Sequence, residues 1–436
     1  MLKHKAVNMV IEKLERSSFV SRHKSNDKDF TRTAKLTFYN LVTLILRKST
    51  KSIQLSLNEF VMQTGENITV TSGAFTKARK KLKHSAFIEL NDDIVNLFYS
   101  ENTPHIKTFK GFRLLGFDGS KINVPNNKET ENYFGSRSTG SKTEKGSGTL
   151  VQATYEACYD VLNKISLGNI LGRGKIYEPV LAEKLFDVMS EKDIGIFDRA
   201  YLSYDFMAKM ITKGKNFVMR CQRKSFLEIQ EMFELEEKTA SKTIDLMPSY
   251  KNLNKARKSG LPDKIKIRLI KITLPNGEVE VLATSILDEA FTIDDFSEIY
   301  RLRWGVETFF SEVKSRLSLE NFTGKSVEAV HQDFWATIFI SNLETIMTED
   351  IDRDLNKQTN TKKKTKINKA VSFNAIKNKV FELFSANLDT GDIVDGLTNL
   401  FLMNRITIRE GRKSVRRNIS DSASLRFQKC TRKQVF

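Results

Sequence analysis

The chain has 436 residues, of which 40% are hydrophobic and 28% are charged, the balance of a soluble globular protein with two or three domains. Its three cysteines, Cys158, Cys221 and Cys430, lie too far apart for a disulfide framework or a zinc-binding spacing. No signal peptide is visible, and apolar runs such as 38–46 are too short to span a membrane. We therefore expect a cytoplasmic protein.

The net charge of +18 is concentrated at the two ends of the chain. Residues 1–100 hold 17 Lys and Arg against 9 Asp and Glu, and residues 351–436 hold 19 against 8, whereas the middle carries a net −1. A polyanionic partner such as nucleic acid, bound mainly by the ends, fits this pattern. The alternative is a solvated lysine-rich surface without such a partner.

Residues 1–105 are predicted to form a helical N-terminal domain, because apolar residues recur there at three- and four-residue intervals. Within it, the segment 71–87 begins with a Thr-Ser pair and continues through Lys77, Arg79, Lys80 and Lys81. A helix of this kind suits contact with DNA phosphates, although an ordinary exposed basic helix has the same pattern.

From residue 112 the hydrophobic period changes to two, which predicts a catalytic core whose first part covers 106–221. Three strands are expected first, then a helix over 176–191, and then a strand–helix–strand unit. This order predicts a mixed α/β sheet. A β-rich insertion is expected over 222–290, where Pro275-Asn276-Gly277 marks a hairpin.

The core is expected to resume over 291–350 and to be followed by a basic helical C-terminal region, 351–436. That region contains a polar stretch at 356–369 and a basic tail at 412–417. The resumed core contains the sequence YRLRWGVETFFSEVKSRL at 300–317, which predicts one amphipathic helix.

Four polar side chains share one stripe of this helix. At about 100° per residue, Arg303, Glu307 and Lys314 fall within roughly 60° of Tyr300. Apolar residues occupy the rest of the circumference. A surface helix with an i,i+4 ion pair between Arg303 and Glu307 explains the same pattern without any site.

Two aspartates favour a metal-binding site over this explanation. Asp118 and Asp198 each lie in an apolar strand sequence, where a carboxylate is costly unless it is paired or binds a metal ion. Asp118-Gly119 is also compatible with a simple tight turn. Together with Glu307, the two aspartates predict a site for Mg²⁺ or Mn²⁺, because such ions prefer oxygen ligands. Three carboxylates can hold two ions for phosphoryl transfer, with Arg303 and Lys314 on the substrate backbone.

The spacing Tyr300-x2-Arg303-x3-Glu307-x6-Lys314 resembles the Y-R-E-K signature of the IS-four family of insertion-sequence transposases, which are of the DDE type. The sequences FDGSKI around Asp118 and FDRAYLSYD around Asp198 resemble the two aspartate motifs of that family. The resemblance departs from the family pattern at Ala200, where Gly is usual, at Ser120, which is often Thr, and at Ser311, which is basic in some members.

The resemblance implies a ribonuclease-H-like catalytic core, an N-terminal domain that binds terminal inverted repeats, and a homodimer acting on two paired DNA ends. It also implies that Asp118, Asp198 and Glu307 bind two Mg²⁺ or Mn²⁺ ions and cleave the DNA ends. The freed 3′-hydroxyls are then joined to target DNA. The DNA contacts expected in the core are Tyr300, Arg303, Lys314, Trp304, Arg199 and Tyr201, and the protein would associate with the nucleoid. Glu156, Asp160 and Asp205 are expected to lie outside the site.

Two alternatives stay open. A metal-dependent nuclease that cuts DNA without joining it would use the same carboxylates. An inactive DNA-binding relic would keep them only as structural residues.

Overall fold

The computed structural model describes residues 2–31, 35–64, 69–138, 149–357, 364–385 and 388–408. The basic tail at 412–417 and Cys430 lie outside these ranges. The chain divides into two compact units, each built from separated segments. The helical unit comprises Met1–His105, Ile122–Ala153 and Ser311–Phe436, and the sheet unit comprises Ile106–Lys121 and Thr154–Phe310.

The helical unit begins with the helices predicted for the N-terminal region. They are α1 (Leu2–Glu15), α2 (Ser17–His23), α3 (Phe38–Arg47), α4 (Ile53–Thr64), α5 (Ser72–Arg79), α6 (Ser85–Glu101) and the short 3-10 helix η1 (Thr103–His105). Thr37 and Thr71 cap α3 and α5 by accepting hydrogen bonds from backbone N–H groups of their first turns.

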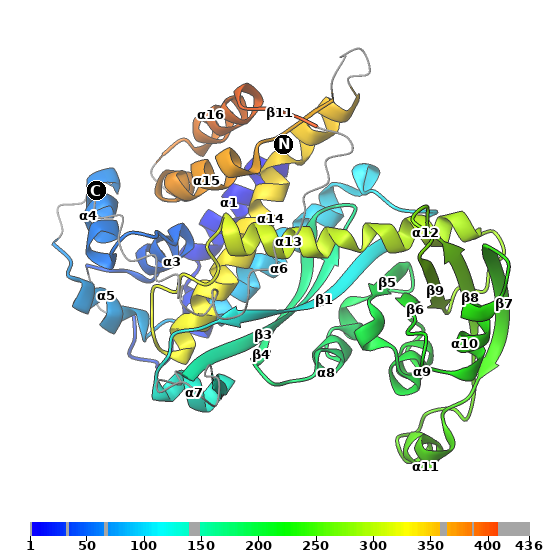
Figure 1. Cartoon of the computed structure of the whole chain (residues 1–436). Helices are drawn as coiled ribbons and strands as arrows, with labels where there is room; N and C mark the ends of the chain where they lie inside the picture. The colour runs from blue at the N-terminus through cyan, green and yellow to red at the C-terminus, as the bar shows by residue number, and fades with distance from the viewer. Residues whose placement is uncertain are drawn as a thin grey trace. The chain divides into compact units, whose positions relative to one another are not determined.

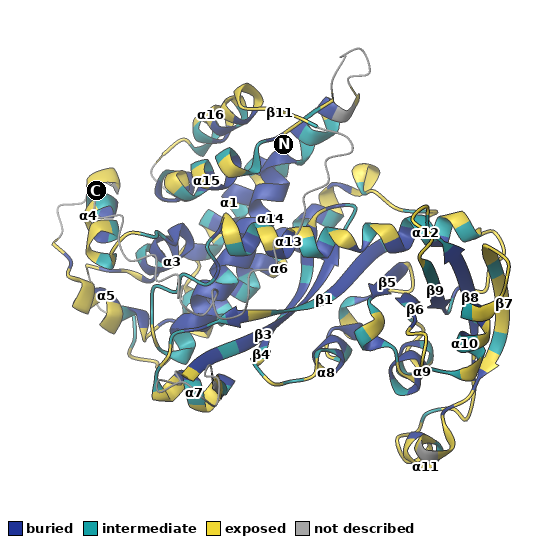
Figure 2. Ribbon diagram, in the orientation of Figure 1, coloured by how far each residue is buried: buried dark blue, intermediate teal, exposed yellow. Residues whose placement is uncertain are grey.

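The rest of the helical unit is formed by later parts of the chain. It contains α7 (Lys128–Phe134), β2 (Ser136–Ser138), α14 (Val327–Lys357), β10 (Thr365–Lys366), α15 (Lys369–Leu383), α16 (Thr390–Met403) and β11 (Ile406–Thr407). The long helix α14 packs against α6, α3 and α15, and its middle is buried (Figures 1 and 2). Within the described ranges, no helix is both long and apolar enough to cross a bilayer.

The sheet unit is built on β1 (Arg113–Asn123), β3 (Thr149–Asp160), β4 (Ile165–Arg173), β5 (Asp193–Phe197) and β6 (Asn216–Arg220), and β1 and β3 extend beyond its boundaries. The hydrogen-bonded order is β4–β3–β1–β5–β6, continued by β9, β8 and β7. Bonds from Val161 N to Leu114 O and from Val124 N to Val151 O show that β1 and β3 are antiparallel. β5 pairs in parallel with both β1 and β6.

In this core, β1 is antiparallel to β3 and parallel to β5. This is the strand order of a ribonuclease-H-like core. The mixed α/β class predicted from the sequence is confirmed, and so is the ribonuclease-H-like core that the resemblance implied. Of the connections, α9 (Tyr204–Thr212) links the parallel strands β5 and β6. The predicted helix over 176–191 is shorter, because α8 (Glu178–Glu183) ends early and is followed by the 3-10 helix η2 (Phe186–Val188).

Residues 222–290 contain the predicted hairpin, β8 (Ile265–Thr273) and β9 (Val279–Thr284). They also contain β7 (Thr239–Leu246) and two helices, α10 (Leu227–Glu234) and α11 (Tyr250–Lys258), which the sequence analysis did not predict. β9 joins the core sheet directly by pairing with β6.

Both faces of the sheet in the sheet unit are covered by apolar layers. One layer joins Phe197 and Met219 to side chains of α8, α9 and α10, such as Phe206. The other joins Ile196 and Val218 to Phe296, Ile299 and Tyr300 of α12 (Ile293–Leu302). The inner strands are therefore buried on both faces, as Figure 2 shows for β5, β6 and β9. Buried parallel strands explain why these segments read as almost continuous apolar runs.

The helix predicted over 300–317 is two helices that meet at Arg303. α12 ends at Leu302, and α13 (Trp304–Ser315) follows in nearly the same direction (Figure 1). The junction is tightened, because Arg303 N and Val306 N each bond to the carbonyl three residues earlier. Tyr300 therefore lies on α12, while Glu307 and Lys314 lie on α13.

Candidate active site

Asp118 lies on β1, and Asp198 directly follows β5, the strand that pairs with β1. β1 pairs with β5 from Arg113 with Asp193 to Gly116 with Ile196, a constant offset along both strands. The same offset, continued two residues further, aligns Asp118 with Asp198. Neighbouring strands lie about 4.8 Å apart, so the two side chains leave the sheet side by side. The sheet register therefore brings together two residues that are far apart in the sequence.

The helix that carries Glu307 packs directly on the strand that carries Asp118. An ideal Cβ on Gly116 would lie 3.3 Å from Cβ of Val306, and one on Gly305 would lie 3.1 Å from Cβ of Val161. Two glycines thus permit the close approach of α13 to β1 and to the end of β3. This contact brings Glu307, which follows Val306, close to Asp118.

The charges of Asp198 and Glu307 both act on Asp118. Burial, together with the negative charges of Asp198 and Glu307, raises the pKa of Asp118 to about 7. The guanidinium of Arg303 acts in the opposite direction and lowers that pKa. Arg303 itself is 8% exposed, and its Nη2 donates to Oε1 of Glu307 at 2.9 Å.

The turn after Asp198 is fixed by hydrogen bonds from three directions. Asp198 caps the 3-10 helix η3 (Arg199–Tyr201) by accepting from Ala200 N at 2.7 Å. The Tyr177 hydroxyl donates to Ala200 O at 2.7 Å, and the Tyr201 hydroxyl donates to Oε1 of Glu156 at 2.8 Å. These bonds hold Asp198 at the end of β5.

Two further carboxylates lie near Asp118 and Asp198: Glu178, which the sequence analysis did not name, and Glu156, which it placed outside the site. Glu156 on β3 is fully buried, and its Oε2 has no hydrogen-bond partner. Glu178 packs over Gly119, where an added Cβ would lie 2.4 Å from Cδ of Glu178. Glu156, which was expected to lie outside the site, is close enough for the charges of Asp118 and Asp198 to act on it.

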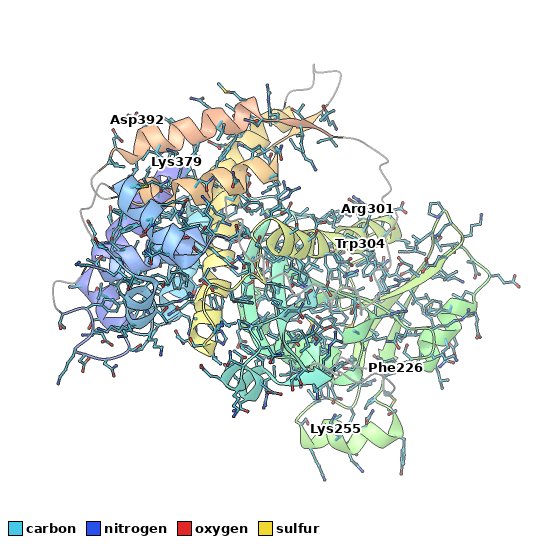
Figure 3. The ribbon with its side chains drawn as sticks, turned by 60° about the vertical axis from the view of Figure 1, so that its left-hand side comes forward. Phe226, Lys255, Arg301, Trp304, Lys379 and Asp392 are labelled. Atoms are coloured by element: carbon cyan, nitrogen blue, oxygen red, sulfur yellow. The ribbon has the colours of Figure 1, made fainter. Side chains whose placement is uncertain are left out.

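Asp160 and Asp205 do lie outside this cluster. Asp160 shapes the connection between β3 and β4 by accepting from Asn163 N at 3.0 Å and Leu162 N at 3.1 Å. Asp205 pairs with Lys255 of α11 at 3.1 Å, and Figure 3 shows Lys255 on that helix.

Glu156 provides a prediction about stability and pH. Burial, together with the negative charges of Glu178, Asp118 and Asp198, raises its pKa to about 9, although the bond from Tyr201 opposes this. The folded protein therefore holds a proton that the unfolded chain releases above about pH 4.5, so this group lowers stability as the pH rises toward 9. We expect Glu156→Gln to stabilise the protein relative to wild type, and by more at pH 8 than at pH 5.

Thermal unfolding midpoints at the two pH values measure this difference. Glu183→Gln is the control, because it removes a partly exposed carboxylate of α8 that pairs with Lys209. A difference between wild type and Glu156→Gln that stays constant from pH 5 to pH 8 would contradict the neutral state of Glu156.

Asp118, Asp198 and Glu307 match the donor chemistry of a hard divalent cation, because all three offer oxygen ligands. A bound cation would also reduce the repulsion between their negative charges. They do not form a finished shell: among the described residues, no three His, Cys, Asp or Glu side chains are gathered closely enough to hold a metal ion. At Glu307 the neighbouring positive charge is instead the guanidinium of Arg303, at 2.9 Å.

The residues predicted to contact DNA fall into two groups. Lys77, Lys80, Lys81 and Arg199 are exposed, and Trp304 is 51% exposed at the start of α13 (Figure 3), while Lys314 is half-buried. Tyr300 and Tyr201 are buried, at 7% and 1% exposure. Tyr201 uses its hydroxyl on Glu156, and Tyr300 packs in the apolar layer beneath α12. Both side chains are therefore engaged by the protein itself, and their contact with DNA stays a prediction.

Arg79 is likewise engaged by the protein itself. It is 4% exposed in the helical unit, and its guanidinium donates to protein acceptors on every nitrogen. The acceptors are Gln332 at 2.6 Å, Thr323 at 2.7 Å, Asp333 at 2.8 Å and the Ala329 carbonyl at 2.9 Å. A guanidinium held in this way is not available to a phosphate. Arg79 is buried on the inner side of α5, while Lys77 and Lys80 are on its exposed side.

The ribonuclease-H-like strand order, with Asp118 and Asp198 in register and Glu307 on the helix against them, defines a DDE-type polynucleotidyl transferase domain. Residues 111–343, more than half of the chain, match the family described as Transposase DDE domain. The chain belongs to this family, and the predicted membership of its IS-four group is confirmed. Domains of this kind depend on divalent metal ions.

Two curated relatives and one solved structure are similar to the chain. Transposase InsG for insertion sequence element IS4, from Escherichia coli K12, is 24% identical over 289 residues, covering 65% of this chain and 62% of InsG. The match thus spans less than two thirds of InsG. Putative transposase InsZ of the same strain is 24% identical over 24% of this chain and 34% of InsZ.

The solved structure is the piggyBac transposase synaptic complex with hairpin DNA, at 10% identity and a TM-score of 0.45. The alignment covers 91% of this chain and 85% of that one.

Proposed function

We propose that this protein is a DNA transposase that binds the terminal inverted repeats of an insertion sequence, cleaves the DNA ends and joins the 3′-hydroxyls to target DNA. The single observation that supports this most strongly is the parallel pairing of β1, which carries Asp118, with β5, which Asp198 directly follows, beside the helix that carries Glu307. Three carboxylates at this point of a ribonuclease-H-like core suit metal-dependent phosphoryl transfer.

Asp118, Asp198 and Glu307 would hold the Mg²⁺ or Mn²⁺ ions, and we propose two of them. When bound, such ions activate the attacking oxygen and stabilise the leaving oxygen of an in-line displacement. The protein's own part is to hold the ligands in place: Asp198 through its capped turn, Asp118 within β1, and Glu307 through the packing of α13 on β1.

The DNA is proposed to contact residues around this site and on the helical unit. Arg303 and Lys314 would bind phosphates of the cleaved end, and exposed Trp304 would stack on a displaced base. Arg199, at the surface beside Asp198, would bind the backbone. Lys77, Lys80 and Lys81 would contact phosphates from the N-terminal domain. The protein would act as a homodimer on two paired ends.

A strand-transfer assay tests this function against the nuclease alternative. Purified full-length protein is incubated with the ends of its own element, taken from the DNA that flanks the reading frame, and with a supercoiled target plasmid in Mg²⁺ or Mn²⁺. We expect pre-cut ends to be joined to the plasmid. Cleavage of uncut ends without any joining would instead identify a nuclease. The absence of both cleavage and joining would identify an inactive DNA-binding relic.

Lys314→Ala is expected to weaken binding of the element end by removing one phosphate contact. Each such contact releases about one counterion, so the slope of log K against log salt should become shallower by about 0.9. Fluorescence anisotropy over a series of salt concentrations measures the slope. Lys213→Ala, in an exposed ion pair with Asp187, is the control and should leave it unchanged. An unaltered slope for Lys314→Ala would remove Lys314 from the phosphate contacts.

A further inference from the structure

The geometry points to Arg303 as a built-in counter-cation of the carboxylate site, which a divalent metal ion displaces from Glu307 when it binds. This inference rests on the proposed function, because it assumes that Glu307 is a metal ligand. It adds a second role for Arg303 beside the proposed phosphate contact: the same side chain holds Glu307 before the metal arrives and is released afterwards.

The first observation is the position of the guanidinium. Nη2 of Arg303 lies 2.9 Å from Oε1 of Glu307, and the charge of Arg303 also acts on Asp118. A single positive charge thus serves two of the three proposed ligands.

The second observation is that Arg303 is only partly satisfied where it lies. The residue is 8% exposed, yet its Nε is buried without a hydrogen-bond partner. A buried donor left unpaired costs free energy comparable to a lost hydrogen bond. This is unlike Arg79, whose guanidinium is bonded on every nitrogen and is therefore fixed. Arg303 is held by its bonds to Glu307 and to the Tyr300 hydroxyl, and with Nε unpaired it is less completely fixed than Arg79.

The third observation is the route of release. The guanidinium carbon of Arg303 lies 5.7 Å from the ring centres of both Tyr300 and Trp304. Tyr300 is buried, whereas Trp304 is 51% exposed. A side chain displaced from Glu307 can therefore move along the Trp304 ring toward solvent, where a DNA phosphate would receive it. Metal binding and phosphate binding are then linked, and each favours the other.

The decisive experiment measures metal affinity in the free protein, without DNA or catalysis. Isothermal titration calorimetry with Mn²⁺ compares wild type with Arg303→Ala. If Arg303 competes with the metal ion, its removal tightens Mn²⁺ binding, by about tenfold if one charge-assisted hydrogen bond no longer has to be broken. If Arg303 only supports Glu307, its removal leaves Mn²⁺ binding unchanged or weakens it, and the inference is overturned.

Matched variants separate this effect from general changes in charge. Arg301→Ala removes an exposed arginine of α12, two residues before Arg303, that is paired with Glu298, and it should not change the Mn²⁺ affinity (Figure 3). Arg303→Ala should give no gain when Glu307→Ala is already present. If neither wild type nor Arg303→Ala binds Mn²⁺, the metal site of the proposed function is wrong and this role of Arg303 falls with it.

A spectroscopic measurement follows the movement itself. The chain contains two tryptophans, Trp304 and Trp335, so Trp335→Phe leaves Trp304 as the sole indole reporter. Mg²⁺ should shift the emission of Trp304 as the guanidinium leaves the ring. In the Arg303→Ala, Trp335→Phe protein the shift should be less than half as large. An equal shift in both proteins would show that Arg303 does not move.

Discussion

Asp118→Asn, Asp198→Asn and Glu307→Gln should each reduce cleavage of the element ends by at least about 10³-fold. When catalytic residues act as a unit, removing one of them costs nearly as much activity as removing all of them. Each substitution keeps the size of the side chain and removes a proposed metal ligand. DNA binding should remain, since the phosphate contacts are proposed to come from other residues. Nicking rates and binding isotherms, measured on the same protein preparations, separate the two effects.

Asp205→Asn is the control for these variants. Asp205 is an aspartate of the same sheet unit, a few residues after Asp198, and it pairs with Lys255 away from the carboxylate cluster. It should cleave like wild type. If any of the three site variants retained cleavage within about tenfold of wild type, that residue would not be a metal ligand. If all three did, the catalytic assignment of the site would be wrong.

Asp333→Ala should destabilise the helical unit by about 3–5 kcal/mol, the usual effect of leaving a buried charge without its partner. Asp333 is fully buried, accepts from Arg79 at 2.8 Å and from Thr323 N at 2.6 Å, and supports the packing of α5 on α14. Arg79→Ala should be similarly costly. Urea unfolding followed by circular dichroism measures both.

Two further variants make this result interpretable. Lys81→Ala changes an exposed neighbour of Arg79 and should alter stability by less than about 0.5 kcal/mol. Replacing both partners, as Arg79→Met with Asp333→Leu, should recover most of the lost stability, because no unpaired charge remains. If Arg79→Ala instead left stability unchanged and made DNA binding less dependent on salt, the original prediction that Arg79 contacts phosphate would be restored.

The catalytic core was predictable because its signals are local. The change from helical to alternating periodicity located β1, β3 and β4, and the apolar runs located β5 and β6. The two aspartates stood out because carboxylates are rare in such runs. The sequence did not show that Asp118 and Asp198 are aligned, since that depends on the register between two strands separated by 80 positions.

Residues whose role depends on burial were predicted less well. Arg79 and Lys80 are adjacent in the sequence and carry the same charge, yet one is 4% exposed and the other is exposed. The residues that bury Arg79 come from 323–333, about 250 positions later. Glu156 was placed outside the site for a similar reason. Its partner Tyr201 belongs to η3, 45 positions later in the sequence.

Sequence alone determined the elements and the chemistry: which segments form strands or helices, which carboxylates stand in apolar surroundings, and which polar residues share a helical stripe. These properties follow from the period of the backbone and from nearest neighbours along the chain. Tertiary structure alone decided which charges are paired with protein and which face solvent. Pairing and burial depend on contacts between distant segments, so Arg303 on Glu307, Arg79 on Asp333 and Glu156 on Tyr201 became visible only in the folded chain.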